Sequence, residues 1–348
     1  FTALIRFKIP NPLERKSRIQ RASAEIQLAE SKYLAEEDKL VRDVRERYET
    51  VSTLESTRSA HQKIQQIYTT FAKDMEAKQI PELLPDVVSA GFDKRKAGRE
   101  VFEATSEIDT AKAELAYYCG LRDPGRIRGG SMTRRFVDPG SLDAAYLSDI
   151  AMLYRADAVE MKARLEIAKA HLGEARASRI PWATFLDAGF SREWSNDRYG
   201  RQDEWTIRMG INIPLWDLFG INKKSAEFKK AVGAWEVSLD KQRHRVESDV
   251  ALAIRHLRIA SEHLGFYEKE LHAQRAEEKT MVPKLAEIAA KMSDYSKYKR
   301  TQYGFDVERQ QTEIARLKAY TEYNKALMFL EDAIGVRIEK ALNASRND

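Results

Sequence analysis

Phe7-Lys8-Ile9-Pro10 and Ile211-Asn212-Ile213-Pro214 are two segments of one kind: each ends a strand-like run and opens onto a very long helical stretch. Proline cannot donate a backbone hydrogen bond to a neighbouring strand, so we expect Pro10 and Pro214 to end strand pairing and to turn the chain into the helix. The strand-to-helix joint occurs twice, roughly two hundred residues apart, and a repeated supersecondary unit of this kind predicts an internal duplication.

Three runs of alternating apolar and polar residues predict strands at residues 1–9, 184–194 and 204–213. Successive side chains of a strand point to opposite faces, so each run has one apolar and one polar side. The second and third runs flank a polar, turn-forming loop at residues 195–203, which predicts a hairpin. The apolar side of this hairpin includes Phe190, Trp194, Trp205, Ile207, Met209, Ile211 and Ile213.

Two interpretations of the strands remain open. The first is an ordinary sheet with one buried face. The second is a transmembrane β-barrel, whose strands need roughly 9–11 residues, whose apolar side faces lipid and whose aromatic residues lie at the membrane interfaces. Trp182, Trp194, Trp205 and Trp216 all stand near strand ends, where such aromatic residues are expected.

The first helical stretch, residues 12–78, contains no helix breaker, and Pro12 suits a first helical turn. At 1.5 Å per residue it would span on the order of 100 Å, and apolar residues seven apart give it a coiled-coil-like period. Two prolines within residues 79–85 predict a reversal of the chain. A shorter helix should follow at residues 86–118 and end at Gly120.

The second half repeats this order of elements. It begins with a loop rich in Gly, Arg and Pro and a middle helix at residues 141–177. The strand hairpin follows, and then a helix at residues 222–294 with Pro283 as a candidate kink. A turn is expected within residues 295–305, before a shorter helix at 306–334 that ends at Gly335. The predicted fold class is therefore mainly α with a small β part, in two internal repeats of strand, long helix, turn and shorter helix.

Composition narrows the class of protein. The 348 residues are 43% hydrophobic and 32% charged, and the net charge of +5 is spread over interleaved acidic and basic residues, which argues against nucleic-acid binding. Cys119 is the single cysteine, so no disulfide can form within the chain. No apolar run approaches the ~20 residues of a transmembrane helix. The chain begins at Phe1 inside a strand-like run, so we expect an N-terminal segment to be missing.

Nothing in the sequence predicts catalysis. His244, His256 and His263 are 12 and 7 residues apart, which is too far along a helix for one metal ion, and no cysteine stands nearby. The glycines at residues 125–130 lack the Lys-Ser/Thr that follows a phosphate-binding loop. We therefore expect no enzymatic activity, no metal and no cofactor.

Several segments resemble motifs of the TolC-like outer-membrane efflux channel family (outer membrane factors). Residues 155–157 and the Ala-rich helix that ends at residues 175–181 are similar to that family's Arg-Pro-Asp to Ala-Arg-x-x-x-x-Pro segment, with Ala156 in place of the proline. Residues 205–217 resemble its second strand and Pro-Leu-Phe-Asp ending, and residues 323–335 resemble its terminal Tyr-Asn-x-Ala-Leu and closing glycine. The likeness covers nearly the whole chain in the family's order.

The resemblance implies a homotrimer in the outer membrane of a Gram-negative bacterium, extending into the periplasm. Family protomers each give four strands to one shared transmembrane β-barrel, and their long antiparallel helices form an α-barrel tunnel; this chain shows three strands, so the fourth would precede Phe1. On this basis residues 1–9 and 183–213 would be barrel strands, and residues 10–120, 141–181 and 214–335 the helical tunnel. Residues 121–140 and 336–348 would be equatorial and loop elements.

The function that the resemblance implies is that of a passive channel in a tripartite efflux or secretion system, with a periplasmic adaptor protein and an inner-membrane transporter as partners. The tunnel would be gated at its periplasmic tip. Residues 295–301 resemble the family's gate segment, with Tyr295 and Arg300 at matching spacing. Asp86 lies at the other tip, where the family has an aspartate that accepts hydrogen bonds. Asp306 stands near Gly304, where the family has an aspartate. The alternative is that these are solvated turn residues.

A second function stays open: a periplasmic coiled-coil adaptor or structural protein that binds such a channel. Adaptors also combine long helices with small β elements, but their strands should not carry a row of large apolar residues that faces outward, as Trp205, Ile207 and Met209 would. The sequence leaves open the transported substrate, the class of inner-membrane pump, lipidation, ion selectivity and the open or closed state of the channel.

Overall fold

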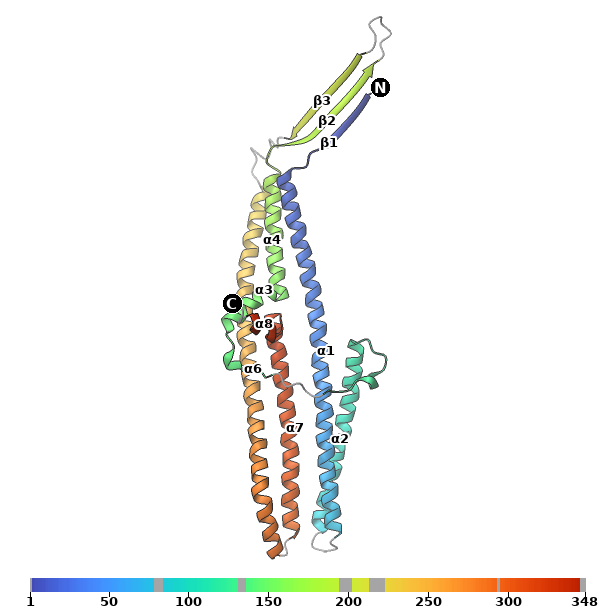
Figure 1. The fold of residues 1–348 in the computed structure, drawn as a ribbon, viewed down its shortest axis with the longest axis vertical. Helices are drawn as coiled ribbons and strands as arrows, with labels where there is room; N and C mark the ends of the chain where they lie inside the picture. The colour runs from blue at the N-terminus through green and yellow to red at the C-terminus, as the bar shows by residue number, and fades with distance from the viewer. Residues whose placement is uncertain are drawn as a thin grey trace. The chain divides into compact units, whose positions relative to one another are not determined.

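The computed structural model describes residues 2–77, 84–130, 136–193, 202–212, 223–292 and 295–344 (Figure 1). The chain forms two compact units. The first unit comprises Phe1–Ala35 and Asp149–Glu247, and the second comprises Glu36–Ser148 and Ser248–Asp348.

The described elements are mostly helices, with one small sheet, so the predicted class, mainly α with a small β part, is confirmed. The order strand, long helix, shorter helix occurs twice along the chain. In sequence order the elements are β1 (Thr2–Lys8), α1 (Pro12–Glu76), α2 (Leu84–Tyr118), the 3-10 turns η2 (Pro124–Arg126) and η3 (Pro139–Ser141), α3 (Ala144–Tyr154), α4 (Ala156–Ala177), β2 (Trp182–Glu193), β3 (Gln202–Asn212), α6 (Lys223–Met292), α7 (Tyr295–Ile334) and α8 (Ile338–Ala344).

The sheet lies within the first unit and is antiparallel, in the order β1-β2-β3. All three predicted strands are therefore present, within two residues of their expected bounds. Pairing of β2 with β3 is regular except for a bulge between Ala183 and Phe185. Such a bulge accommodates one extra residue in a strand and increases its local twist.

The first strand-to-helix joint is held by Asn11. Its side-chain oxygen accepts hydrogen bonds from the backbone N–H groups of Leu13 (3.0 Å) and Glu14 (3.4 Å), which is the geometry of a helix N-cap. Its side-chain amide donates to the carbonyl of Ala177 (3.0 Å), the last residue of α4. Pro12 is the first residue of α1, as expected. The second joint, with Ile213 and Pro214, lies outside the described residues.

The helical part of the first unit packs the beginning of α1 and of α6 against α4 (Figure 1). Small residues make close packing possible, because the buried face of α4 is largely alanine. Polar contacts join the same helices: Arg21 of α1 pairs with Glu174 of α4 (2.9 Å), and Gln242 of α6 donates to Asp157 of α4 (2.7 Å).

The middle helix is not continuous, contrary to the prediction of one helix at residues 141–177. It begins at Ala144 as α3, which ends at Tyr154, and α4 begins at Ala156. Arg155 between them has extended backbone angles, φ −66° and ψ 126°. Its N–H completes the last turn of α3 at Ala151, while its carbonyl accepts the first bond of α4 from Val159. An alanine-rich sequence gives no local sign of this break.

The second unit contains two helical hairpins, α1 with α2 and α6 with α7. One core cluster, Val51, Leu115, Ala116 and Ile127, lies between α1, α2 and the following loop. A second joins α1 and α2 to α7 through Ala60, Ile64, Ala97, Val307 and Ile314. The apolar side chains of α7 contribute to the packing of this unit, because Ile314, Tyr320, Leu327 and Leu330 are buried.

Two predicted helix ends are confirmed and one predicted turn is wrong. Gly120 and Gly335 have positive φ values of 66° and 78°, the left-handed conformation that follows many helices. The turn expected within residues 295–305 is absent, because α7 begins at Tyr295 and these residues are helical. Helix α6 also continues through Pro283. Tyr303, within the segment expected to form the turn, packs its ring against Phe71 of α1.

Candidate functional site

One face of the sheet is continuously apolar. The register aligns Ala3, Phe190 and Trp205 in one row across the three strands; the next two rows are Ile5, Ala188 and Ile207, and Phe7, Leu186 and Met209. The rings of Phe190 and Trp205 lie 4.8 Å apart. Five of the seven residues predicted for the apolar side, Phe190, Trp205, Ile207, Met209 and Ile211, thus lie on strands β2 and β3; Trp194 and Ile213 lie outside the described residues.

This apolar face is open in the isolated chain. Trp205 and Ile207 are 78% and 79% exposed, and Ile5, Phe7, Met209 and Ile211 are also more than half exposed. Apolar surface costs on the order of 25 cal/mol per Å² in contact with water, and soluble monomers rarely expose contiguous patches of more than a few hundred Å². The face is therefore a surface that another apolar medium or molecule should cover.

The opposite face of the same sheet is polar and carries a charged row. Arg6, Asp187 and Arg208 are aligned across the three strands. Arg6 binds Asp187 with two parallel hydrogen bonds, Nε to Oδ1 and Nη2 to Oδ2, both 2.8 Å. This is the two-point geometry that suits a guanidinium and a carboxylate. Sequence reasoning missed the row, although each residue stands on the polar side of its strand.

The polar face depends on Gly210. The ring of Phe185 lies over it, and a Cβ at residue 210 would stand 2.1 Å from Cε1 of that ring. In turn, the guanidinium carbon of Arg6 lies 4.6 Å from the centre of the Phe185 ring. The glycine therefore makes room for the aromatic ring on which the charged row rests.

Both outer strands of the sheet are edges. The sheet has β1 at one side and β3 at the other, and no further described strand pairs with either. Edge strands present unpaired N–H and C=O groups and are ready to pair with other strands. The edges and the apolar face together indicate a sheet that is completed outside the described part of this chain.

The predicted gate residues lie in the second unit, near the ends of the two hairpins. Asp86 is in the first turn of α2 and Tyr295 is the first residue of α7, but their side chains lie outside the described residues. Arg300 and Asp306 are on α7, with Arg300 exposed and Asp306 half-buried. The predicted contacts of Asp86 and Tyr295 with the other two residues therefore stay predictions.

A different contact joins the hairpins at this end. The hydroxyl of Tyr303 on α7 donates to Asp74 on α1 (2.7 Å), and the Lys299 ammonium lies 3.7 Å from the same carboxylate. The Tyr303 ring packs 5.1 Å from that of Phe71, beside Met75 and Ala90. No sequence signal could have linked residues 74 and 303, because only the fold brings α1 and α7 together.

Asp306 belongs to a second cluster, within the α6–α7 hairpin. Arg309 donates to Asp306 (3.0 Å) and to Glu278 on α6 (2.6 Å), so one cation serves two acids. Burial raises the pKa of Asp306 above its ordinary value; Arg309 opposes the shift and Glu278 adds to it. Arg309 thus links α7 to α6 at a partly buried position, where an unpaired charge would be costly.

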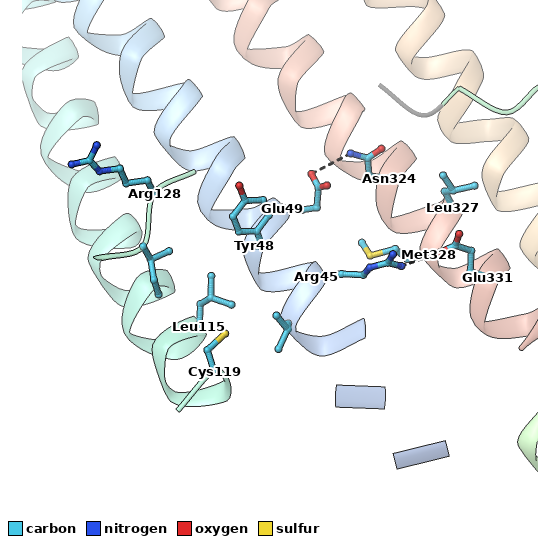
Figure 2. Close-up of a pocket in the computed structure, with 12 residues that line it drawn as sticks. Arg45, Tyr48, Glu49, Leu115, Cys119, Arg128, Asn324, Leu327, Met328 and Glu331 are labelled. Carbon is cyan, nitrogen blue, oxygen red and sulfur yellow. Dashed lines mark hydrogen bonds and ion pairs between the residues drawn. The ribbon is translucent and has the colours of Figure 1, made fainter. Parts of the chain in front are cut away.

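A cavity of about 450 Å³ lies farther along the second unit, between α1, α2 and α7 (Figure 2). Arg45 pairs with Glu331 across it (3.2 Å), and Asn324 donates to Glu49 (3.2 Å). Figure 2 shows Arg128 directed away from these pairs. The four polar side chains on α1 and α7 thus satisfy one another, and the rest of the lining includes Leu115, Leu327 and Met328.

The described residues offer no group of three or more His, Cys, Asp or Glu side chains that could hold a metal ion. Among the helices that the structure describes, none has the length and apolar character needed to cross a membrane.

Long helices in two hairpins, with a small antiparallel sheet that is apolar on one side, define the fold of TolC-like outer-membrane channels. No protein-family model and no curated protein matches the sequence. Solved structures with this fold do match, at identities that establish the fold alone, and they confirm the expected TolC-like fold.

Three of these structures show the extent of the likeness. The outer-membrane protein VceC of Vibrio cholerae is 16% identical, with a TM-score of 0.64 over 97% of this chain and 79% of VceC. CusC, whose structures concern folding and transmembrane channel formation, is 15% identical, with a TM-score of 0.59 over 96% of this chain and 77% of CusC. The MtrE outer-membrane channel of Neisseria gonorrhoeae, in its open state, is 16% identical, with a TM-score of 0.58 over 93% of this chain and 71% of MtrE.

Proposed function

We propose that this chain is one protomer of a trimeric outer-membrane channel, a passive conduit across the outer membrane and the periplasm. Its strands contribute to a shared β-barrel, and its hairpins contribute to a helical tunnel with a gate at the periplasmic tip. The fold shared with VceC, CusC and MtrE supports the channel class. Closed cyclic symmetry is the common way for identical subunits to complete one another's open surfaces.

The observation that carries the proposal is the combination of an exposed apolar face with two open edges in one sheet. In a membrane every backbone polar group must be satisfied, and a sheet achieves this only when its edges are closed by further strands. Lipid would cover the exposed side chains of Trp205, Ile207 and Met209 on β3 and so remove their apolar surface from water. The face with Arg6, Asp187 and Arg208 would then border a water-filled lumen, as the alternation of barrel strands requires.

The tip contacts support a gate that differs in part from the one expected. Tyr303 and Asp74 join the two hairpins of one protomer, so moving the hairpins apart would break their hydrogen bond. Hydrogen bonds to charged groups contribute about 1.5–3 kcal/mol each, and a trimer would repeat the bond three times. Asp86, Tyr295 and Arg300 stay proposed members of the gate, and Asp306 a proposed support of the α6–α7 hairpin.

The proposal places the protein in the outer membrane of a Gram-negative bacterium, with its helices in the periplasm. A periplasmic adaptor protein and an inner-membrane transporter would be its partners in a tripartite efflux or secretion system. In this arrangement the transporter selects the cargo and the channel only conducts it.

The test is conductance of the purified protein in a planar lipid bilayer, together with its oligomeric state in detergent. A trimer that inserts and forms ion-conducting pores is the expected result. A protein that stays dispersed without detergent and gives no pores at any concentration would instead favour a periplasmic adaptor. That second function is less consistent with an exposed face as apolar as this one.

A further inference from the structure

Charges on the polar face of the sheet are sorted along the strands. Lys8 lies at the end of β1 next to the helical joint, and the row of Arg6, Asp187 and Arg208 lies one row farther along. Glu204 lies two rows beyond the arginine row, in line with Thr2 and Ser191. At about 3.3 Å per residue this separates the acid from the arginines by roughly 13 Å.

The basic end has more positive than negative groups. Asp187 is 2% exposed and both of its oxygens are bound by Arg6, whereas the side chain of Arg6 remains 53% exposed. Arg208 is exposed and lies opposite Asp187 on the neighbouring strand, where the two charges also interact. With Lys8, which is also exposed, three cations face one covered carboxylate.

Among these cations, Arg6 is also positioned by its neighbours. The Phe185 ring lies beneath the Arg6 guanidinium, and Gly210 makes room for that ring. A stacked and doubly hydrogen-bonded guanidinium has a defined place on the face, which a solvated side chain would lack. Fixed charges of one sign around a narrow aqueous passage favour ions of the opposite sign.

We propose that Arg6, Lys8 and Arg208 form a positive band on the lumen side of the sheet that makes the channel prefer anions. The proposal rests on the proposed function, because the trimer would repeat the band three times around one lumen. The band would attract small anions and anionic solutes. Glu204 is the nearest described acid along the strands that is not covered.

Reversal potentials in a planar bilayer under a tenfold KCl gradient test the band. We expect the unsubstituted channel to prefer chloride, Arg208→Gln to lower the chloride-to-potassium permeability ratio about twofold, and Arg208→Glu to lower it further, with no loss of conductance. Lys8→Gln should act in the same direction, and it guards against a local effect of the Arg208 changes.

The matched control is Arg192→Gln. Arg192 is on β2 but on the other face of the sheet, where its guanidinium lies 5.5 Å from the ring of Phe190. Its loss should leave the permeability ratio unchanged. Normal pores with unaltered selectivity in Arg208→Glu would overturn the band while leaving the channel intact. Absence of any pore in the unsubstituted protein would overturn the proposed function, and the band with it.

Discussion

The sheet of the first unit and the helical hairpins of the second distribute polarity in opposite ways. In the hairpins, Leu257, Leu330 and Ile334 are fully buried while the charged side chains lie mostly outside. In the sheet, Trp205 and Ile207 are exposed and the aspartate at residue 187 is covered. One chain therefore follows the ordinary rule for water-soluble proteins in one region and its reverse in the other.

The two regions are therefore built for different surroundings. Hydrophobic burial within the chain can stabilise the hairpins in water. A one-layer sheet offers no interior, so its apolar side gains stability only from a medium or partner outside the chain. Comparable substitutions in the two regions should therefore change the stability of the protein by different amounts in water, detergent and lipid.

The largest effect is expected in the helical core. Leu257→Ala on α6 should lower the free energy of unfolding by about 2–5 kcal/mol, because a fully buried leucine leaves a cavity when it is truncated. Urea unfolding followed by circular dichroism measures it. The control is Leu252→Ala on the same helix, where the side chain is exposed and the loss should stay within about 0.5 kcal/mol. Equal losses would contradict the assignment of this core.

A slightly smaller effect is expected on the sheet, and it should depend on the face. Ile207→Arg should destabilise the lipid-inserted protein by about 2–4 kcal/mol, as expected for an arginine that faces the bilayer interior. Thr206→Arg, one residue earlier on the same strand, points to the polar face and should be tolerated. Unfolding from lipid vesicles measures both. If the two variants lose equal stability, the proposed orientation of the sheet is wrong.

A third prediction concerns the contact that joins the hairpins. Tyr303→Phe removes the hydroxyl that donates to Asp74 and should weaken the association of the hairpins by about 1.5–3 kcal/mol, which single-channel recording would detect as more frequent opening. Tyr298→Phe is the control, since the Tyr298 hydroxyl has no hydrogen bond among the described residues. Unaltered opening in Tyr303→Phe would remove this contact from the proposed gate.

The smallest effect is a pH dependence at Asp306. Burial raises the pKa of this carboxyl in the folded state, so the fold binds its proton more tightly than the unfolded chain does. Its contribution favours folding at low pH and is lost as pH rises from the ordinary value of 3.8 through the raised pKa. Asp306→Asn should abolish this part of the pH profile of urea unfolding.

Arg309→Gln supplies the counter-test. The guanidinium lowers the pKa of Asp306, so its loss should move the window of declining stability to higher pH. A window that moves to lower pH, or does not move, would show that Arg309 has no such influence.

Much of the fold could be predicted because its signals are local. Alternation identified the strands and assigned Trp205 and Ile207 to one side, and glycines at residues 120 and 335 marked two helix ends. The break at Arg155 could not be predicted, because an alanine-rich sequence favours helix on both sides of it.

The candidate site was less predictable because its contacts join distant residues. Asp74 and Tyr303 are 229 positions apart, and Arg6 and Asp187 are 181 apart. Periodicity places a residue on a face, but it does not say which residue of another element lies opposite. The internal duplication and the boundaries between barrel, tunnel and equatorial elements stay predictions.

Asn11 has a consequence for the chemical lifetime of the protein. Its amide serves two helices at once, accepting at the start of α1 and donating to the end of α4. Conversion to aspartate would replace that donor with an oxygen facing the carbonyl of Ala177. Asparagine ages chiefly by ring closure through the backbone N–H of the next residue, and Pro12 has none. The residue that begins the helix therefore also protects its cap from spontaneous deamidation by that route.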